Sequence, residues 1–119
     1  MEKVAVLDAK PETEDVLRGM TQLIVWEIHP AQIILFGSRA RGDASSDSDV
    51  DLLIILDEEF GPDHPRHELL RRLRARLSGF GVAKDLLLHS RAYVEEWRGS
   101  LNHVVGRALR EGRVLYERL

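Results

Sequence analysis

Apolar residues recur along this chain at helical spacing in two long segments. In segment 11–28, leucine, methionine and isoleucine return every three or four residues, and Pro11 suits a first helical turn. In segment 66–78, a stripe of leucines alternates with a series of arginines. Both patterns predict amphipathic helices. Shorter helices are expected over about 38–41, 90–97 and 100–111.

Three short apolar runs separate these helices and predict β-strands. The run Val50–Leu56 is almost entirely leucine, isoleucine and valine, so we expect a central strand covered on both faces. The other two runs cover 33–36 and 82–88. Gly112 is suited to cap the last helix, and residues 114–116 should then pack back as an extended tail. The alternation predicts an α/β fold with a small mixed β-sheet flanked by helices.

The composition limits the number of domains, the kinds of partner and the cellular compartment that we expect. A chain of 119 residues with 44% hydrophobic residues can form one modest core, so residues 1–119 are expected to make a single domain. Cysteine is absent, which excludes disulfides and thiolate metal sites. The net charge of -3 argues against strong binding to bulk nucleic acid, although the arginines of segment 66–78 leave direct RNA binding open. With neither a secretory signal pattern nor a membrane-length apolar run, we expect a cytoplasmic protein with no membrane partner.

Three acids lie within or directly before the predicted strands. Asp49 and Asp51 flank the start of the central strand, and residues i and i+2 of a strand point to the same side. Asp85 is a third acid in an otherwise apolar strand, and it would join the first two if that strand lies beside the central one. Carboxylates held this close repel one another, so a divalent cation is the simplest compensation. Oxygen ligands alone favour Mg²⁺ or Mn²⁺, and three carboxylates suit a site for two ions ~3.5–4 Å apart.

A glycine turn lies upstream of these acids. Gly37 separates a predicted strand from a short helix, and Ser38 is suited to the N-cap position of that helix. Backbone N–H groups at such a turn can approach an anion, and a helix N-terminus favours negative charge. Arg39 and Arg41 lie in the first turn, where a cation opposes the helix macrodipole by ~0.3–1 kcal/mol. This position is poor for structural arginines, so all four residues are predicted to bind a polyphosphate.

The acids allow two interpretations other than a metal site. Asp47, Asp49, Asp51 and Glu58 also match positions 1, 3, 5 and 12 of a calcium-binding EF-hand loop, although its glycine position is occupied by Leu52. Alternatively, residues 47–49 make only a polar turn. The glycine turn and Asp85 favour the metal site over both.

The motifs together resemble the signature of the DNA polymerase beta-like nucleotidyltransferase superfamily. The carrying segments are 35–42, Leu-Phe-Gly-Ser-Arg-Ala-Arg-Gly, and 48–52, Ser-Asp-Val-Asp-Leu. The family pattern is Gly-Ser, about ten residues, Asp-x-Asp and a third acid on a later strand, for which Asp85 is the best match. The short length and the ending 109–116 resemble the minimal nucleotidyltransferase branch of this superfamily. The resemblance extends from the first strand to the C-terminus, and its paired motifs are specific.

This resemblance implies the nucleotidyltransferase fold and a set of roles. Gly37 and Ser38 would hold the β- and γ-phosphates of a nucleoside triphosphate, with ATP as the expected substrate. Asp49 and Asp51 would bind two Mg²⁺ ions, and Asp85 would complete the catalytic metal site and help to deprotonate the acceptor hydroxyl. In-line attack on the α-phosphorus would then transfer a nucleoside monophosphate and release pyrophosphate.

The resemblance also implies a partner. The minimal branch is one half of two-gene modules, in which it resembles an antitoxin paired with a helical HEPN ribonuclease-type protein. This chain would then adenylylate or cover a HEPN-family protein, within a hetero-oligomer. Two alternatives remain: a non-catalytic antitoxin that neutralises its partner by covering it, and an enzyme for a small-molecule acceptor such as an aminoglycoside.

Overall fold

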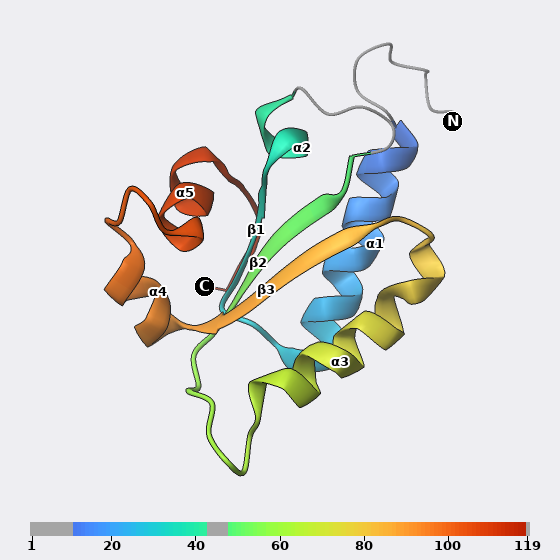
Figure 1. Cartoon of the computed structure of the whole chain (residues 1–119). Helices are drawn as coiled ribbons and strands as arrows, with labels where there is room; N and C mark the ends of the chain where they lie inside the picture. The colour runs from blue at the N-terminus through green and yellow to red at the C-terminus, as the bar shows by residue number, and fades with distance from the viewer. Residues whose placement is uncertain (1–10, 43–47, 119) are drawn as a thin grey trace.

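The computed structural model describes residues 11–42 and 48–118, in which a four-stranded mixed β-sheet carries helices on both faces (Figure 1). The elements follow one another in the order α1 (Pro11–Ile28), β1 (Gln32–Phe36), α2 (Ser38–Arg41), β2 (Val50–Leu56), α3 (Arg66–Leu77), the 3-10 turn η1 (Ser78–Phe80), β3 (Lys84–Ser90), α4 (Arg91–Trp97), α5 (Val104–Glu111) and β4 (Arg113–Glu117). This arrangement confirms the predicted fold class.

The strands lie in the order β3-β2-β1-β4. β2 and β3 are parallel and pair along their full length, from Val50 opposite Lys84 to Leu56 opposite Ser90. β1 is antiparallel to both β2 and β4. β2 is buried at every position except the half-buried Asp51, as expected for a central strand covered on both faces.

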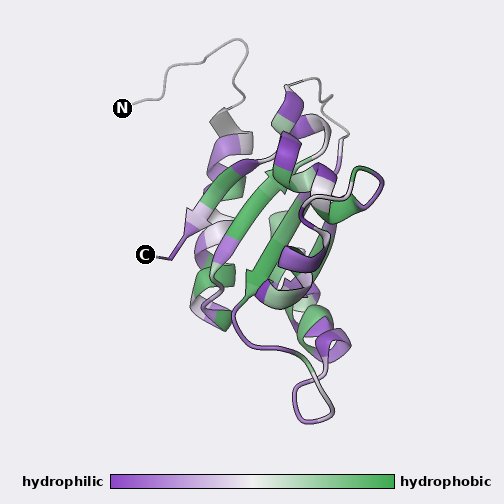
Figure 2. Ribbon diagram, turned by 90° about the vertical axis from the view of Figure 1, so that its left-hand side faces the viewer, coloured by the Kyte–Doolittle hydropathy of each residue, from purple (hydrophilic) through white to green (hydrophobic). Residues whose placement is uncertain are grey.

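Alternate residues of the central strands face two different helical layers. One row packs under α1 and α3; it contains Ile33, Leu35, Leu52, Ile54, Leu86 and Leu88. The other row packs under α4 and α5; it contains Ile34, Phe36, Leu53 and Ile55. Figure 2 shows the strands as a largely apolar layer between helices with polar outer faces. A polar side chain in either row therefore lies under helices or at the rim of the core.

Three predicted elements differ from the structure in type or by more than a single residue at one end. The third strand is Lys84–Ser90 rather than 82–88, because its extent is set by pairing with β2. The last predicted helix begins at Val104, where the His103 side chain accepts a hydrogen bond from the Val105 backbone N–H at 3.0 Å. The expected extended tail is a full strand, β4, bonded to the edge of β1.

One predicted helix cap is wrong, and a second is right in position but not in conformation. The N-cap of α2 is Gly37, with φ 76°, and Ser38 is the first helical residue. Gly112 is the C-cap of α5, as predicted, but it is extended with φ -82° and does not adopt the left-handed conformation of many glycine caps. A Cβ at Gly112 would overlap the side chain of Ile34, so this position requires a glycine for space and not for its backbone angle.

The EF-hand interpretation is also wrong. Leu52, which takes the glycine position of that loop, is fully buried within β2. Asp47, the first position of the loop, lies outside the described residues.

None of the helices in 11–42 and 48–118 combines the length and the apolar character needed to cross a membrane.

Candidate functional site

Three chain segments meet at the end of the sheet where β2 begins. β1 runs antiparallel to β2, so its last residue, Phe36, lies opposite Asp51. β3 runs parallel to β2, so Asp85 lies opposite Asp51 on the other side. Asp49 directly precedes β2. The strand register therefore brings together the three acids that the sequence predicts, although their roles in catalysis stay predictions.

Asp51 occupies an unusual place for an acid. It belongs to the row of β2 that includes Leu53 and Ile55, which pack under α4 and α5. It is half-buried, whereas Asp49 and Asp85 are exposed. Partial burial raises the pKa of the Asp51 carboxyl, and the nearby charges of Asp85 and Asp49 raise it further, against the opposite effect of Arg41 and Arg39. The site thus holds more negative charge than its own arginines offset.

Gly37 lies against the Asp51 carboxylate. Its φ of 76° and ψ of -160° are backbone angles that essentially only glycine adopts. A Cβ at this position would overlap Asp51 Oδ2 and would lie 3.1 Å from Asp51 Cγ. The glycine of the Gly-Ser motif is therefore required both by the turn and by the close approach of the acid.

The two arginines of α2 have partners in the protein. Arg39 donates two hydrogen bonds to the backbone carbonyl oxygen of Ser48, at 3.1 Å from Nε and 2.7 Å from Nη2. Arg41 Nη1 lies 3.4 Å from Glu111 Oε1, in an exposed ion pair with a residue of α5. Arg39 therefore ties α2 to the residue that precedes Asp49.

Neither partner is evident from the sequence pattern. The Ser48 contact uses a backbone atom, which carries no residue signature. Glu111 is 70 residues from Arg41 in the sequence. The two side chains meet because β4, which directly follows α5, pairs with β1 and so holds the end of α5 beside the sheet. The family-like ending 109–116 is the one signal that could have pointed to Glu111.

The donor set at this end consists of carboxylate oxygens, which suits Mg²⁺ or Mn²⁺. Across 11–42 and 48–118, no three His, Cys, Asp or Glu side chains already form a group that could hold a metal ion. The electrostatics nevertheless favour a cation, because the pKa of Asp51 is raised by partial burial and, in addition, by its two acidic neighbours.

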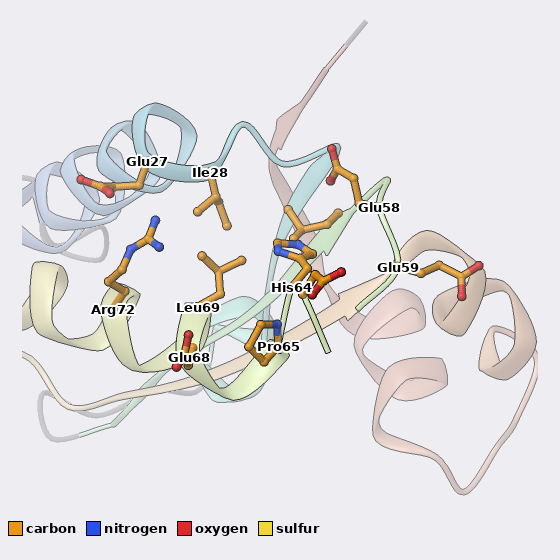
Figure 3. A pocket seen from close by; sticks show the side chains of 11 residues that line it. Glu27, Ile28, Glu58, Glu59, His64, Pro65, Glu68, Leu69 and Arg72 are labelled. Carbon is orange, nitrogen blue, oxygen red and sulfur yellow. The ribbon is translucent and has the colours of Figure 1, made fainter. Parts of the chain in front are cut away.

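The opposite end of the sheet carries a cavity of about 590 Å³ (Figure 3). Five acids line it: Glu27, Glu58, Glu59, Asp63 and Glu68. They come from α1, α3 and the loop after β2, and the cavity also includes Arg72 and His64. These acids share no strand register, so this cavity lacks the backbone-fixed arrangement of the three aspartates.

Comparison with known proteins shows the family to which the chain belongs. Residues 20–110 match the model of the nucleotidyltransferase domain family. The chain belongs to this family, and it is a nucleotidyltransferase enzyme by that membership and by a relative named as a protein adenylyltransferase. That relative is a candidate protein adenylyltransferase of Methanocaldococcus jannaschii, 40% identical over 86 residues, which are 71% of this chain and 77% of the relative.

Three solved structures have a fold similar to that of this chain. It is similar to a candidate minimal nucleotidyltransferase, with 29% identity, a TM-score of 0.58, and coverage of 86% of this chain and 92% of the other. The fold is also that of a toxin-antitoxin protein crystallised with AMP-PNP, with 20% identity, a TM-score of 0.53, and coverage of 85% and 73%. A candidate nucleotidyltransferase from Sulfolobus solfataricus shares the fold with 17% identity, a TM-score of 0.54, and coverage of 92% and 90%. The predicted resemblance to the minimal nucleotidyltransferases is confirmed.

Proposed function

We propose that this protein, with residues 1–119 as one domain, transfers AMP from ATP to a hydroxyl group of a HEPN-family toxin and acts as its antitoxin. The observation that carries the proposal is the register of Asp51 with Asp85, which joins Asp49 beside the Gly37 turn. In a nucleotidyltransferase, three acids held together at a repulsive site are explained by the ions that accompany a triphosphate.

The triphosphate would bind at the start of α2. The backbone of Gly37 and the hydroxyl of Ser38 would contact the β- and γ-phosphates. Arg41 is exposed, and an exposed ion pair such as the one with Glu111 is worth only ~0–1 kcal/mol, so this guanidinium can turn to the phosphates. Arg39 would contribute its charge while it keeps its hydrogen bonds to Ser48. It would thereby hold the segment that positions Asp49.

Asp49 and Asp51 would hold two Mg²⁺ ions, or Mn²⁺, with Asp85 completing one of the two sites. Asp49 and Asp85 are exposed, so their side chains can turn toward a common ion beside the more fixed Asp51. When bound, the ions would neutralise the charge of the triphosphate and activate the attacking oxygen.

The chemical step is a single displacement. The acceptor hydroxyl oxygen forms a bond to the α-phosphorus, and the bond from that phosphorus to the bridging oxygen breaks. Pyrophosphate leaves with the electron pair, and the hydroxyl proton passes to the Asp85 carboxylate. Because Asp85 is exposed, it can release this proton to solvent.

Two similar proteins support the proposed partner and acceptor. The Methanocaldococcus relative is named for adenylyl transfer to protein, and one structural neighbour is a toxin-antitoxin protein crystallised with AMP-PNP. Both favour a protein acceptor and an adenine nucleotide for this chain. The supply of ATP and Mg²⁺ that the reaction needs favours a cytoplasmic setting.

The test is transfer from α-³²P-ATP with Mg²⁺ to the HEPN-family protein proposed as its partner. We expect label on the partner with the wild-type protein and none with Asp49→Asn. The matched control is Asp63→Asn at the opposite end of the sheet, which removes an exposed acid and should leave the label unchanged.

Two outcomes would contradict the proposal. Equal labelling by Asp49→Asn would show that the three acids do not catalyse the transfer. A stable complex that suppresses the toxin without any label, and equally well with Asp49→Asn, would favour the covering module instead.

A further inference from the structure

Helix α1 carries an exposed stripe on the side away from its buried residues. Leu17, Met20 and Ile24 of α1 are buried in the core under the sheet. Five other residues are exposed and follow one another at intervals of three or four: Asp15, Arg18, Gln22, Trp26 and, just beyond the helix, His29. This spacing places the four helical residues along one line of the helix surface, and His29 follows just beyond the end of the helix. Trp26 is 76% exposed, which is unusual for so large an apolar side chain on a free surface.

The stripe borders a furrow between α1 and β4. One hollow of about 190 Å³ includes Arg18, Gln22 and Leu115. A second of about 280 Å³ includes Gln22, Trp26 and Tyr116. The two hollows share Gln22 and Thr21, so they adjoin along the helix. β4 is the edge strand of the sheet, so the outer side of the furrow has no further strand among the described residues.

The order of side chains in the stripe is self-complementary. If a second α1 lies antiparallel across a two-fold axis at Gln22, Arg18 of each copy faces Trp26 of the other. The same axis sets Asp15 opposite His29. Each pair occurs twice, as an interface between two identical surfaces requires. An arginine over an indole ring is favourable by ~0.5–2 kcal/mol, and an aspartate can accept a hydrogen bond from an imidazole N–H.

We propose that α1 and the furrow beside β4 form the interface of a two-fold homodimer. The occupant of the furrow is α1 of a second copy, which at 18 residues is ~27 Å long. The in-chain ion pair of Arg18 with Asp15, at 2.8 Å, is exposed, and an exposed ion pair contributes only ~0–1 kcal/mol. A partner with a surface of one charge would fit less well, because the stripe contains both a cation and an anion.

The dimer would leave both candidate active sites open. α1 packs on one face of the sheet, whereas Asp51 belongs to the row that faces α4 and α5. Each protomer would then present its carboxylates and its α4–α5 side outward, so dimerisation and transfer activity can be tested separately.

The test is the mass of the intact chain in solution, by light scattering and sedimentation, over roughly 1 to 200 μM, which spans a Kd near ~10 μM. We expect conversion to twice the 13.6 kDa chain mass. Trp26→Ala and Trp26→Arg should each weaken the dimer by about tenfold or more, as loss of a central aromatic contact does. The matched control is Leu101→Ala, because Leu101 is 74% exposed but lies away from α1.

The decisive variant exchanges the two residues. Arg18→Trp combined with Trp26→Arg restores both pairs only if residue 18 of one copy faces residue 26 of the other, so it should recover most of the lost affinity. A chain that stays monomeric at the highest concentration would overturn the proposal. So would a dimer that Trp26→Ala leaves unchanged, or a Trp26→Ala variant that loses its HEPN-family partner while the chain never self-associates.

Discussion

The two ends of the β-sheet both carry several carboxylates, but they hold them in different ways. Where β2 begins, Asp51 lies in register with Asp85, and its pKa is raised by burial and by the two other aspartates. Where β2 ends, acids from helices and a loop surround an open cavity of about 590 Å³ (Figure 3). There Asp57, the first residue after β2, forms ion pairs with Arg91 and Arg118.

The difference lies in what the backbone permits. An acid on a loop or at a helix surface can turn to water or to an arginine, so its charge is offset locally. An acid inside a strand is fixed by the register, and Asp51 cannot leave its neighbours without breaking the sheet. The count of acids at an end of the sheet therefore says little, whereas fixed and repulsive acids indicate where a cation is needed.

The largest expected effect is on transfer activity. Asp51→Asn should lower the initial rate of AMP transfer by at least ~100-fold, because a carboxylate that holds an ion is replaced by a neutral amide. Glu58→Gln, at the cavity end, should stay within about twofold, as exposed substitutions usually do. Both are measured with labelled ATP under identical Mg²⁺. A similar loss in Glu58→Gln would erase the distinction between the ends.

Gly37→Ala should produce the next largest effect, on folding stability. The methyl group would need unfavourable backbone angles and would overlap the Asp51 carboxylate, so we expect a loss of ~3 kcal/mol in the free energy of unfolding. Gly79→Ala is the matched control, because a Cβ there meets nothing within 4 Å. Urea unfolding curves measure both. A Gly37→Ala protein as stable as Gly79→Ala would show that the turn can relax away from Asp51.

Much of the fold could be predicted from local sequence, and the reason is visible in particular elements. Helix Pro11–Ile28 and strand Val50–Leu56 have the predicted bounds, because each has a strong periodic or continuous apolar pattern. β3 lies two residues further along the chain than the sequence predicts, since its pairing with β2 fixes where it begins and ends. The sequence predicts β4 only as an extended tail, because its partner β1 is some 80 residues away.

Part of the candidate site is also predictable from the sequence. The spacing of Asp49 and Asp51 is local, and the acid in the later strand is conspicuous by its chemistry. The contact of Arg39 with the Ser48 carbonyl was not predictable, because any residue could supply that oxygen. The exposed stripe of α1 is likewise helical in sequence, but its solvent exposure becomes visible only once the core side of the helix is known.

The end of the sheet that carries the cavity also contains a half-buried histidine, which offers a smaller test of the same comparison. Burial lowers the pKa of His89 to about 4, and the charges of Arg66 and His103 contribute in the same direction. Its neutral form is therefore stabilised by folding, fully above pH 6.5, and this stability is lost as pH falls from 6.5 toward 4.

After a discount for solvent screening at this half-buried ring, we expect His89 to contribute about 1 kcal/mol of the stability lost between pH 7 and pH 4. His89→Phe keeps a ring that can stack on Tyr93 and should flatten that part of the pH profile. His67→Gln, at an exposed position of α3, should leave the profile unchanged. An unaltered slope in His89→Phe would assign the acid sensitivity to other groups.

The smallest expected effect is a change in Tm, measured for one substitution at each end of β2. In metal-free buffer at pH 7, Asp51→Asn should raise the Tm by ~2–4 °C, because it removes a charge that Asp85 and Asp49 repel. The sign follows from linkage: a raised pKa means that the folded state favours the neutral acid, so the stability it contributes below about pH 3.8 is lost as pH rises through the folded pKa.

Asp57→Asn should instead lower the Tm slightly, because it breaks exposed ion pairs with Arg91 and Arg118. Added Mg²⁺ should raise the Tm of the wild type and not that of Asp51→Asn. If both substitutions lowered the Tm, the acids at the start of β2 would be as well compensated as Asp57, and the contrast between the two ends would fail.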